Sequence, residues 1–306
     1  MTLAVVLGAN GFIGRHVAEA LNGGPDIAVV GAGLGDPLHG LESGWLDMDL
    51  LAGDGRPEAE LRALHPDVIV NCTGATAGTA AELERLNVDT TAALLHAIER
   101  SGIGARLIHL GSAAEYGPGP VGRPVVETAP ARPMSPYGIA KLAATRLVAE
   151  AASAGRDAVV LRVFNALGPG MPAGTLPGGA LHRLTEAVAA SAPRIEMGSL
   201  DSVRDFVDVR DIGAAVLAAC RAPRLDAAIV NIGSGTGHSA RELVRAIAER
   251  VGFTGEIGEA GAGSPRSSDV PWQVADVSLA KRLLGWRAVH DLRSAVELMT
   301  PPPLSR

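Results

Sequence analysis

The chain has 306 residues, nearly half of them apolar, with very few aromatic side chains and a formal net charge of −6. This composition predicts a soluble globular protein with a well-filled aliphatic core. The acidic balance and the lack of a dense Lys/Arg run argue against nucleic acid or an anionic membrane as a partner. No window approaches the roughly 18 apolar residues of a membrane span, and the run Leu3 to Leu7 is too short for a signal peptide, so we expect a cytoplasmic protein.

The cysteines and histidines carry no sign of a metal site. Cys72 and Cys220 form neither a Cys-x-x-Cys pair nor a disulfide framework, and the eight histidines are scattered without ligand spacing. We therefore predict no structural metal.

The N-terminal segment has the pattern of a strand, a glycine turn and a helix. The apolar run Leu3 to Leu7 is followed by the turn Gly8 to Gly14, spaced Gly-x-x-Gly-x-x-Gly, and by an amphipathic run from Arg15 to Leu21. Such glycines permit a tight turn and a close approach of the backbone to a pyrophosphate, although a turn that is merely tight is the alternative. We predict a dinucleotide site formed here by Gly8, Asn10, Gly11, Phe12, Ile13 and Gly14.

The end of the second predicted strand bears on the choice of cofactor. The run Ile27 to Val30 ends in Gly31-Ala32-Gly33, where an NAD site usually places an acid against the ribose 2′-hydroxyl. That acid is missing, and Arg15 is available to a 2′-phosphate, although a solvated helix residue explains it equally well. We predict NADP as the cofactor, with NADPH favoured and NAD not excluded.

Two later segments extend the predicted cofactor site. Asp67 to Gly74 is a buried strand that ends in small residues, as needed where a chain passes close to a flat cofactor. Asp49 would place a carboxylate near the adenine amine, unless it lies in a solvated loop. The cofactor contacts predicted in these and the following segment are Asp49, Leu50, Cys72, Thr73, Gly74 and Asn87.

Strands and helices alternate through the first half of the chain. A helix is predicted from Asn87 to Arg100, where apolar residues recur at helical spacing, and a strand from Arg106 to Leu110. This alternation implies parallel βαβ units and hence an α/β fold with a doubly wound Rossmann sheet.

The composition changes from Phe164 onward. Gly- and Pro-rich segments at 168–179 and 261–271 predict loops over a cleft, whereas Asp205 to Ala219 has the pattern of strand, turn and helix, and Ile229 to Ile232 that of a strand. We predict a dinucleotide-binding Rossmann domain over residues 1–163, completed by about 207–232. A smaller C-terminal substrate-binding α/β domain then takes residues 164–206 and 233–306.

A Tyr-x-x-x-Lys spacing at 137–141 joins one of only two tyrosines to one of only two lysines. Ser135 is a good N-cap and Pro136 suits the first helical position, so Tyr137 and Lys141 share one helical face. The ammonium one turn away favours the phenolate, and the pair makes a usable proton donor and acceptor. The alternative is a surface stack of the two side chains.

With these motifs the chain resembles the extended short-chain dehydrogenase/reductase family, the nucleotide-sugar epimerases, dehydratases and reductases. The motifs that carry the resemblance are the glycine turn at residue 8, Ser112, Tyr137-x-x-x-Lys141, Arg162-Val163-Phe164-Asn165 with Gly168-Pro169-Gly170, Arg204-Asp205-Phe206-Val207, Asn231 to Gly235 and Leu283-Leu284-Gly285-Trp286. The resemblance implies three catalytic residues. Tyr137 is the acid/base, Lys141 holds the nicotinamide ribose and lowers the pKa of the tyrosine, and Ser112 hydrogen-bonds the reacting oxygen.

The residues after Ser112 separate the reactions of this family. Members that eliminate water typically carry an Asp-Glu pair there, whereas this chain has Ala113 and Ala114. The Glu115-Tyr116-Gly117 ending and the run 164–171 are most similar to the GDP-4-keto-6-deoxymannose reductases and related deoxysugar 4-ketoreductases. We predict an NADPH-dependent 4-ketoreductase of a nucleotide-activated deoxysugar. The alternatives are a nucleotide-sugar 4-epimerase with tightly bound NAD and a non-catalytic dinucleotide sensor.

The predicted substrate is therefore a nucleotide-diphosphate sugar. Arg204 and Arg266 are expected to clamp the diphosphate, because a bidentate guanidinium suits phosphate oxygens, with ordinary surface charge as the alternative. Asn165 is a candidate donor to the sugar nucleotide or a turn former. The predicted substrate contacts are Ser112, Ala113, Glu115, Asn165, Arg204 and Arg266.

The helices predicted at 87–100 and 136–152 are apolar on more than one face. A helix of this kind needs a second surface to cover it, so we predict a homodimer formed by these two helices, as the resemblance also implies. Burial of both faces within one chain is the alternative.

Overall fold

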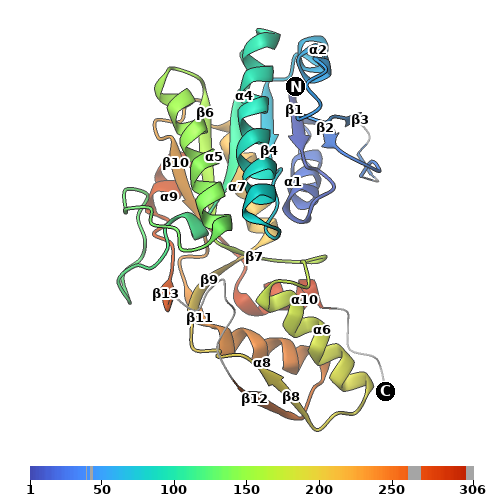
Figure 1. The fold of residues 1–306 in the computed structure, drawn as a ribbon, viewed down its shortest axis with the longest axis vertical. Coiled ribbons are helices and arrows are strands. Elements are labelled where there is room, and N and C mark those ends of the chain that lie inside the picture. The colour runs from blue at the N-terminus through green and yellow to red at the C-terminus, as the bar shows by residue number, and fades with distance from the viewer. Residues whose placement is uncertain (39, 42–43, 261–269, 301–306) are drawn as a thin grey trace.

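A computed structural model describes residues 1–38, 40–41, 44–260 and 270–300 as a larger and a smaller part (Figure 1). The larger part holds a seven-stranded parallel sheet with the strand order β10-β6-β5-β4-β1-β2-β3. Its strands are β1 (Thr2–Leu7), β2 (Ile27–Gly33), β3 (Trp45–Asp47), β4 (Val68–Asn71), β5 (Arg106–Ser112), β6 (Ala158–Val163) and β10 (Ile229–Ile232). The predicted doubly wound Rossmann sheet is confirmed.

Helices cover both faces of this sheet (Figure 1). One face carries α1 (Phe12–Asn22), α7 (Val209–Arg221) and α9 (Ser278–Leu284), and the other carries α2 (Arg56–Leu64), α4 (Thr90–Ser101) and α5 (Pro136–Ser153). A short helix α3 (Ala80–Glu84) and a π-helical turn (Arg85–Asp89) lead into α4. Because both faces are covered, the strands are nearly continuous apolar runs rather than alternating ones.

The order of the strands reverses between β1 and β4, which are neighbours in the sheet although β2 and β3 lie between them in sequence. Open α/β sheets bind ligands at the carboxyl ends of their strands beside such a switch point. The turn after β1 and the segment after β4 both begin there. The predicted cofactor residues of these two segments are thus brought to one edge of the sheet.

Among the described residues, the smaller part contains two short sheets and three helices. Its strands are β7 (Asn165–Leu167), β9 (Val203–Asp208), β11 (Gly237–Ser239) and β13 (Trp272–Gln273) in one sheet, and β8 (Arg194–Met197) and β12 (Glu256–Glu259) in the other. The helices are α6 (Leu176–Ala189), α8 (Ala240–Val251) and α10 (Leu292–Met299). They enclose a separate apolar core around Leu184, Leu243 and Ile247.

The chain passes from the smaller part back to the larger part within the predicted strand, turn and helix of 205–219. Strand β9 joins the small mixed sheet, whereas α7, which follows it directly, packs on α1 over the large sheet. A Cβ on Gly213 would lie 2.6 Å from the Cβ of Ala20, so a small residue is needed where α7 meets α1.

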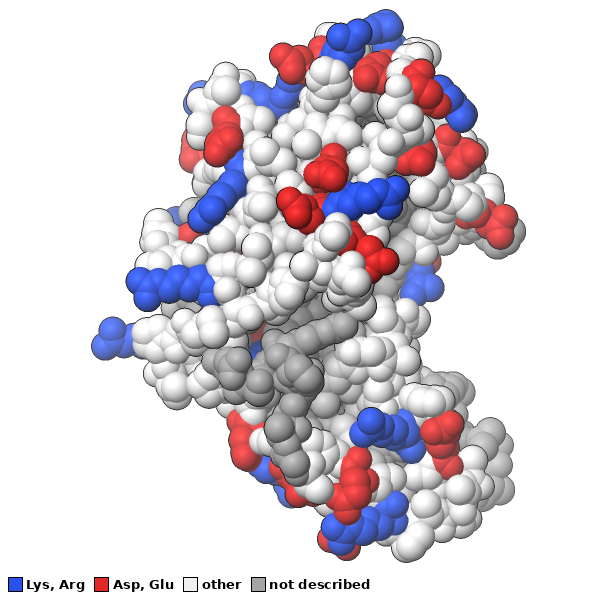
Figure 2. Space-filling view, in the orientation of Figure 1, with Lys and Arg blue, Asp and Glu red and all other residues white. Residues whose placement is uncertain are grey.

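Figure 2 shows the molecule narrowing between its larger and smaller parts, with charges of both signs interspersed over the visible face. Among the helices that the structure describes, none has the length and apolarity to cross a membrane.

Candidate active site

The glycine turn fits a dinucleotide through its backbone. Gly8 has φ +71°, and a Cβ on Gly14 would lie 2.0 Å from the carbonyl oxygen of Gly8, so glycine is needed at both positions. Helix α1 begins after Gly11 without a side-chain cap, which leaves its first amide N–H groups available to a pyrophosphate. The side chains of Phe12 and Ile13 pack against the core, so their backbone is the part that can face a cofactor.

Arg15 has partners that the sequence did not predict. Its Nη2 donates to the carbonyl oxygens of Pro169 and Gly170, at 3.2 and 3.0 Å. This arrangement differs from the contact with a 2′-phosphate that we expected. Asn10, within the turn, donates its Nδ2 to the carbonyl oxygen of Leu34 at 2.8 Å and so ties the turn to the segment after β2.

Trp45 fills the space beside the end of β2. A Cβ on Gly31 would lie 2.8 Å from the Trp45 ring, and a Cβ on Gly33 would lie 3.6 Å from it. The ring therefore requires a residue without a side chain at Gly31. No residue from Ile27 to Gly33 carries a carboxylate, so the strand itself brings no negative charge against a 2′-phosphate.

The end of β4 passes close to the glycine turn. A Cβ on Gly8 would lie 3.1 Å from the carbonyl group of Cys72. Thr73 donates both its N–H and its hydroxyl to Oδ1 of Asn71, at 3.1 and 2.6 Å, which fixes the turn after the strand. Burial raises the pKa of the Cys72 thiol to about 12, so the thiol stays neutral at physiological pH and is a poor nucleophile.

Asn87 shapes the same segment from the neighbouring π-helical turn. Its side chain is buried and donates Nδ2 to the carbonyl oxygens of Ala75 and Leu83, at 3.0 and 2.8 Å. A Cβ on Gly74, which has φ +135°, would lie 2.4 Å from Oδ1 of Asn87. These contacts let Asn87 hold the loop after β4, and its contact with the cofactor stays a prediction.

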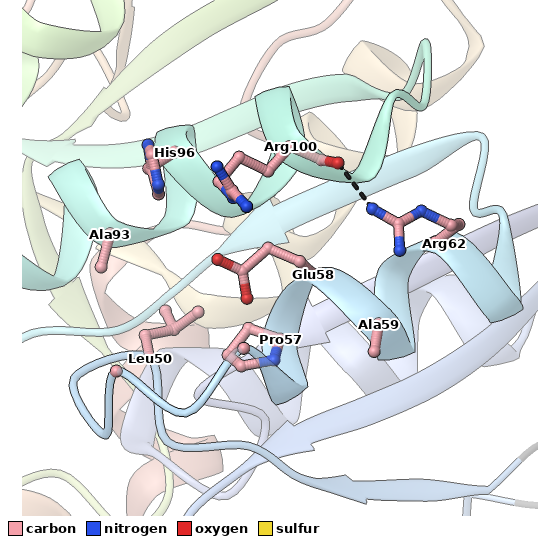
Figure 3. Close-up of a pocket in the computed structure, with 10 residues that line it drawn as sticks. Leu50, Pro57, Glu58, Ala59, Arg62, Ala93, His96 and Arg100 are labelled. Carbon is pink, nitrogen blue, oxygen red and sulfur yellow. Dashed lines mark hydrogen bonds between the residues drawn. The ribbon is translucent and has the colours of Figure 1, made fainter.

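Asp49 and Leu50 follow Met48, whose N–H donates to the carbonyl oxygen of Gly33 at the end of β2, at 3.1 Å. Oδ1 of Asp49 accepts the N–H of Leu51 at 2.9 Å, and Leu50 lines a groove of about 480 Å³ between α2 and α4 (Figure 3). Arg62 of α2 donates to the carbonyl oxygen of Arg100 of α4 at 2.7 Å across one end of this groove. None of the predicted catalytic residues lines the groove, so we do not place the chemistry there.

The three predicted catalytic residues lie on β5 and α5, two elements that pack together. Ser112 ends β5 and caps a short 3-10 turn, with its Oγ accepting the N–H of Ala114 at 3.2 Å. Helix α5 begins after Ser135, and a Cβ on Gly138 would lie 2.5 Å from the carbonyl oxygen of Ala114. The first turn of α5, which carries Tyr137, is therefore pressed against the turn that carries Ser112.

Lys141 lies one helical turn further along α5. Its side chain is buried and its Nζ donates to the carbonyl oxygen of Leu110 on β5. Burial lowers the pKa of this lysine, while the nearby Glu115 and Cys72 oppose the shift. The site thus holds a desolvated amine beside Tyr137 and Ser112.

Glu115, which we predicted to contact the substrate, is buried in the structure. Its carboxylate is fully buried and accepts from the Nε of Arg162 at 2.6 Å, the N–H of Ser112 at 2.7 Å and the hydroxyl of Thr145 at 3.0 Å. With these three partners it fixes the backbone of Ser112 from behind. These contacts are those of a residue that positions Ser112, and a contact of Glu115 with the substrate stays a prediction.

Arg162 is a site residue whose role sequence reasoning missed. It lies in β6, and burial acts to lower its pKa, but Glu115 and Tyr116 together raise it. Its guanidinium lies 4.5 Å from the centre of the Tyr116 ring, and the Tyr116 hydroxyl donates to Oδ1 of Asn231 at 2.6 Å. The sequence did contain a signal for this role, since Arg162 lies within the apolar run of a buried strand and a buried charge needs a buried partner.

The predicted substrate residues lie at the junction with the smaller part. Asn165 donates its Nδ2 to the carbonyl oxygen of Asp205 at 3.0 Å. Arg204 is buried, donates Nη1 to the carbonyl oxygen of Val203 at 2.8 Å, and has its pKa lowered by burial to about 10. Arg266 lies outside the described residues. Ala113 is buried, and its carbonyl oxygen accepts from Gln273 at 3.0 Å.

The described residues contain no group of three His, Cys, Asp or Glu side chains placed to hold a metal ion. What the site does contain is a hydroxyl, a phenol and a buried amine at the carboxyl end of β5, beside a backbone turn that fits a dinucleotide. A phenol next to an amine can hold and transfer a proton, and a positioned hydroxyl can orient a carbonyl or alcohol oxygen.

Comparisons with known proteins agree with this geometry. Residues 4–233 match the model of the NAD dependent epimerase/dehydratase family. A dTDP-6-deoxy-L-talose 4-dehydrogenase (NAD(P)(+)) from Kitasatospora kifunensis is 38% identical over 305 residues, covering 96% of this chain and 94% of that protein. A UDP-glucose 4-epimerase from Azospirillum brasilense is 30% identical over 94% of this chain and 87% of its own. The solved structure of MoeE5 in complex with UDP-glucuronic acid and NAD has a TM-score of 0.83 at 28% identity, covering 98% of this chain and 97% of that one.

Proposed function

Because the chain belongs to the NAD-dependent epimerase/dehydratase family and is an NAD(P)-dependent oxidoreductase of it, we propose that it reduces a nucleotide-activated 4-keto-6-deoxy sugar at the 4-keto group. One observation carries this proposal. Ser112 and the first turn of α5 with Tyr137 are packed together, with the buried Lys141 next to them, while Ala113 and Ala114 stand where a dehydratase would need acidic groups.

The side chains divide the work of reduction. The glycine turn and Lys141 would hold the dinucleotide, which would supply the hydride when bound. Since the Oγ of Ser112 already accepts the N–H of Ala114, its own hydroxyl proton is free to donate to the oxygen of a ketone. Tyr137 then gives its phenolic proton to the same oxygen as negative charge develops there, and Lys141 stabilises the phenolate that remains.

The alanines after Ser112 limit the reaction to this step. Elimination of water needs a second acid and base beside the sugar, and neither Ala113 nor Ala114 can supply one. The protein would therefore leave C6 of the deoxy sugar chemically unchanged.

The nucleotide part of the substrate is proposed to lie toward Asn165 and Arg204. With a pKa of about 10, Arg204 keeps its positive charge at neutral pH despite its burial, as a diphosphate ligand must. Arg266 remains a prediction. The 38% identical relative carries a dTDP-linked 6-deoxy sugar in its name, which supports a dTDP-sugar as the first substrate to test.

We propose NADPH as the favoured cofactor. Support comes from the segment Ile27–Gly33, which brings no carboxylate to the end of β2, and not from Arg15, whose Nη2 is bound to backbone carbonyls. NAD is kept as the alternative, since the similar relative from Kitasatospora kifunensis is named for both cofactors.

A nucleotide-sugar 4-epimerase is the second candidate, because a relative 30% identical over 94% of this chain has that activity. An epimerase would return the hydride to the opposite face and leave the cofactor unchanged. The third candidate function, a dinucleotide sensor without activity, is disfavoured because the chain has all three predicted catalytic residues, Ser112, Tyr137 and Lys141.

The test is incubation of the protein with dTDP- and GDP-linked 4-keto-6-deoxyhexoses and NADPH and, separately, with UDP- and dTDP-hexoses, with absorbance followed at 340 nm and the sugars then analysed. The proposal expects stoichiometric loss of NADPH and a sugar with a new 4-hydroxyl. Interconversion of UDP- or dTDP-hexoses without net loss of NADPH would instead establish the epimerase.

A further inference from the structure

Two consecutive residues of α1 hold the segment 168–175, which joins β7 to α6. Nη2 of Arg15 donates to the carbonyl oxygens of Pro169 and Gly170, at 3.2 and 3.0 Å. Nε2 of His16 lies 3.2 Å from the same oxygen of Pro169, and because a carbonyl only accepts, the imidazole donates there. The helix that carries the glycine turn is thereby tied to the start of the smaller part.

The segment is shaped to receive this arginine. Gly170 has φ +71°, and a Cβ on it would lie 1.8 Å from Nη2 of Arg15, so any side chain there would displace the guanidinium. Gly168 is constrained in the same way, since its Cβ would lie 2.3 Å from the side chain of Val209 on α7. The segment therefore packs against two helices of the larger part at positions where only glycine fits.

The same segment is continuous with the substrate side. The carbonyl oxygen of Pro172 accepts the hydroxyl and the N–H of Thr175, at 2.7 and 3.0 Å, and Thr175 caps α6 by accepting the N–H of Gly178 at 3.2 Å. At its other end the segment follows β7 and Asn165, which is bonded to the backbone of Asp205. Segment 168–175 thus connects β7 to α6, which both belong to the smaller part, and Arg15 holds this connection against the larger part.

We propose that Arg15 is a positioning residue that fastens segment 168–175 to the glycine turn, and that it is not a ligand of the cofactor's 2′-phosphate. The inference rests on the proposed function in so far as Asn165 and its neighbours bind a nucleotide diphosphate. While Nη2 holds both carbonyl oxygens, this nitrogen is not available to a 2′-phosphate. Loosening this contact should therefore weaken substrate binding and leave the choice between NADPH and NADH unchanged.

Two variants break the contact from opposite sides, and a third is a matched control. Arg15→Gln removes the guanidinium, and Gly170→Ala displaces it from the segment side. Gly174→Ala makes the same chemical change within the same segment, but its Cβ would meet no atom within 4 Å. Circular dichroism first checks that each variant is folded. If Gly170→Ala fails to fold, Arg15→Gln alone tests whether Arg15 fastens the segment.

Three measurements are then made. Hydrogen–deuterium exchange of residues 168–175 is followed in the cofactor-free protein, dissociation constants for NADPH and NADH are obtained by fluorescence titration, and binding of dTDP to the NADPH-loaded protein is measured by calorimetry. Because hydrogen bonds from a charged donor are lost, we expect faster exchange and about tenfold weaker dTDP binding in Arg15→Gln and Gly170→Ala. The ratio of the two cofactor constants should stay within about twofold of wild type, and Gly174→Ala should match wild type throughout.

The opposite pattern overturns the proposal. If Arg15→Gln weakens NADPH binding about tenfold relative to NADH while exchange of 168–175 stays at the wild-type rate, Arg15 is a phosphate ligand. Should the wild-type protein bind no nucleotide diphosphate, the proposed function fails, and the exchange rates alone still decide whether Arg15 fastens the segment.

Discussion

Replacing Glu115 by glutamine should destabilise the protein strongly, because it breaks a buried ion pair from one side only. The carboxylate is fully buried and 2.6 Å from the Nε of Arg162, and glutamine of nearly the same shape leaves that guanidinium without its counter-charge. Breaking a buried pair in this way typically costs about 3–5 kcal/mol. We expect a loss of this size in the free energy of unfolding, measured by urea denaturation followed by circular dichroism.

The control is Glu150→Gln, an exposed position on α5, which should change the free energy of unfolding by less than about 0.5 kcal/mol. The double variant Glu115→Gln/Arg162→Met should lose less than the sum of the two single variants, because the unpaired charge is then absent. A loss below about 1 kcal/mol in Glu115→Gln would refute the reasoning that this pair supports the site.

The same variant should also change the activity. Burial already lowers the pKa of Lys141 and Glu115 acts against that shift, so removing the negative charge lowers the pKa of Lys141 further. The folded protein then loses this proton at lower pH, and the alkaline limb of the pH–rate profile should move to lower pH. If both the alkaline limb of the pH–rate profile and the turnover rate kept their wild-type values, Glu115 would have no influence on the reaction.

The remaining predictions concern the proton donor, the cofactor and the assembly. Tyr137→Phe keeps the ring and removes the proton, so turnover should fall by about 10² to 10⁴ while the dissociation constant for the cofactor stays close to wild type; near-normal turnover would end the acid/base assignment. Gly33→Asp places a carboxylate at the end of β2, where its Cβ would be 3.3 Å from Oδ1 of Asn10, and should lower kcat/KM for NADPH relative to NADH by about tenfold or more. Ile139 on α5 and Leu86 before α4 are exposed apolar side chains, so light scattering should give a dimer mass that Ile139→Glu reduces, and a monomer in the wild type would contradict the dimer.

Local patterns were enough to predict the frame of the site. The strands on both sides of the switch point are short apolar runs ended by small residues, and the glycine turn and Tyr137-x-x-x-Lys141 depend on neighbours within one or two turns. The structure places them as the pattern indicates: β1, the turn and α1 follow in order, and α5 begins at Pro136 after its Ser135 cap.

The contacts that the sequence did not predict come from partners far away in sequence. Glu115 was predicted to contact the substrate, and the structure pairs it with Arg162 of the neighbouring strand β6. Arg15 follows the glycine turn, yet it is bound to a segment of the smaller part. The glycines at the end of β2 were interpreted as a missing acid, and the structure adds that Trp45 needs the space at Gly31. Pairings of this kind are set by topology, which the spacing of residues along the chain does not reveal.

The most direct test of the proposed reaction is the fate of the transferred hydrogen. The protein would be incubated with dTDP-4-keto-6-deoxyhexose and NADPH carrying deuterium at both C4 positions of the nicotinamide, and the sugar product analysed by mass spectrometry. Reduction at the 4-keto group predicts one deuterium in each product sugar, located at C4, and about 10² to 10⁴ times less labelled product per unit time when Tyr137→Phe replaces the wild type. A keto sugar and NADPH that both remain unconsumed, together with 4-epimerisation of UDP- or dTDP-hexoses in a parallel incubation without uptake of deuterium, would contradict the account.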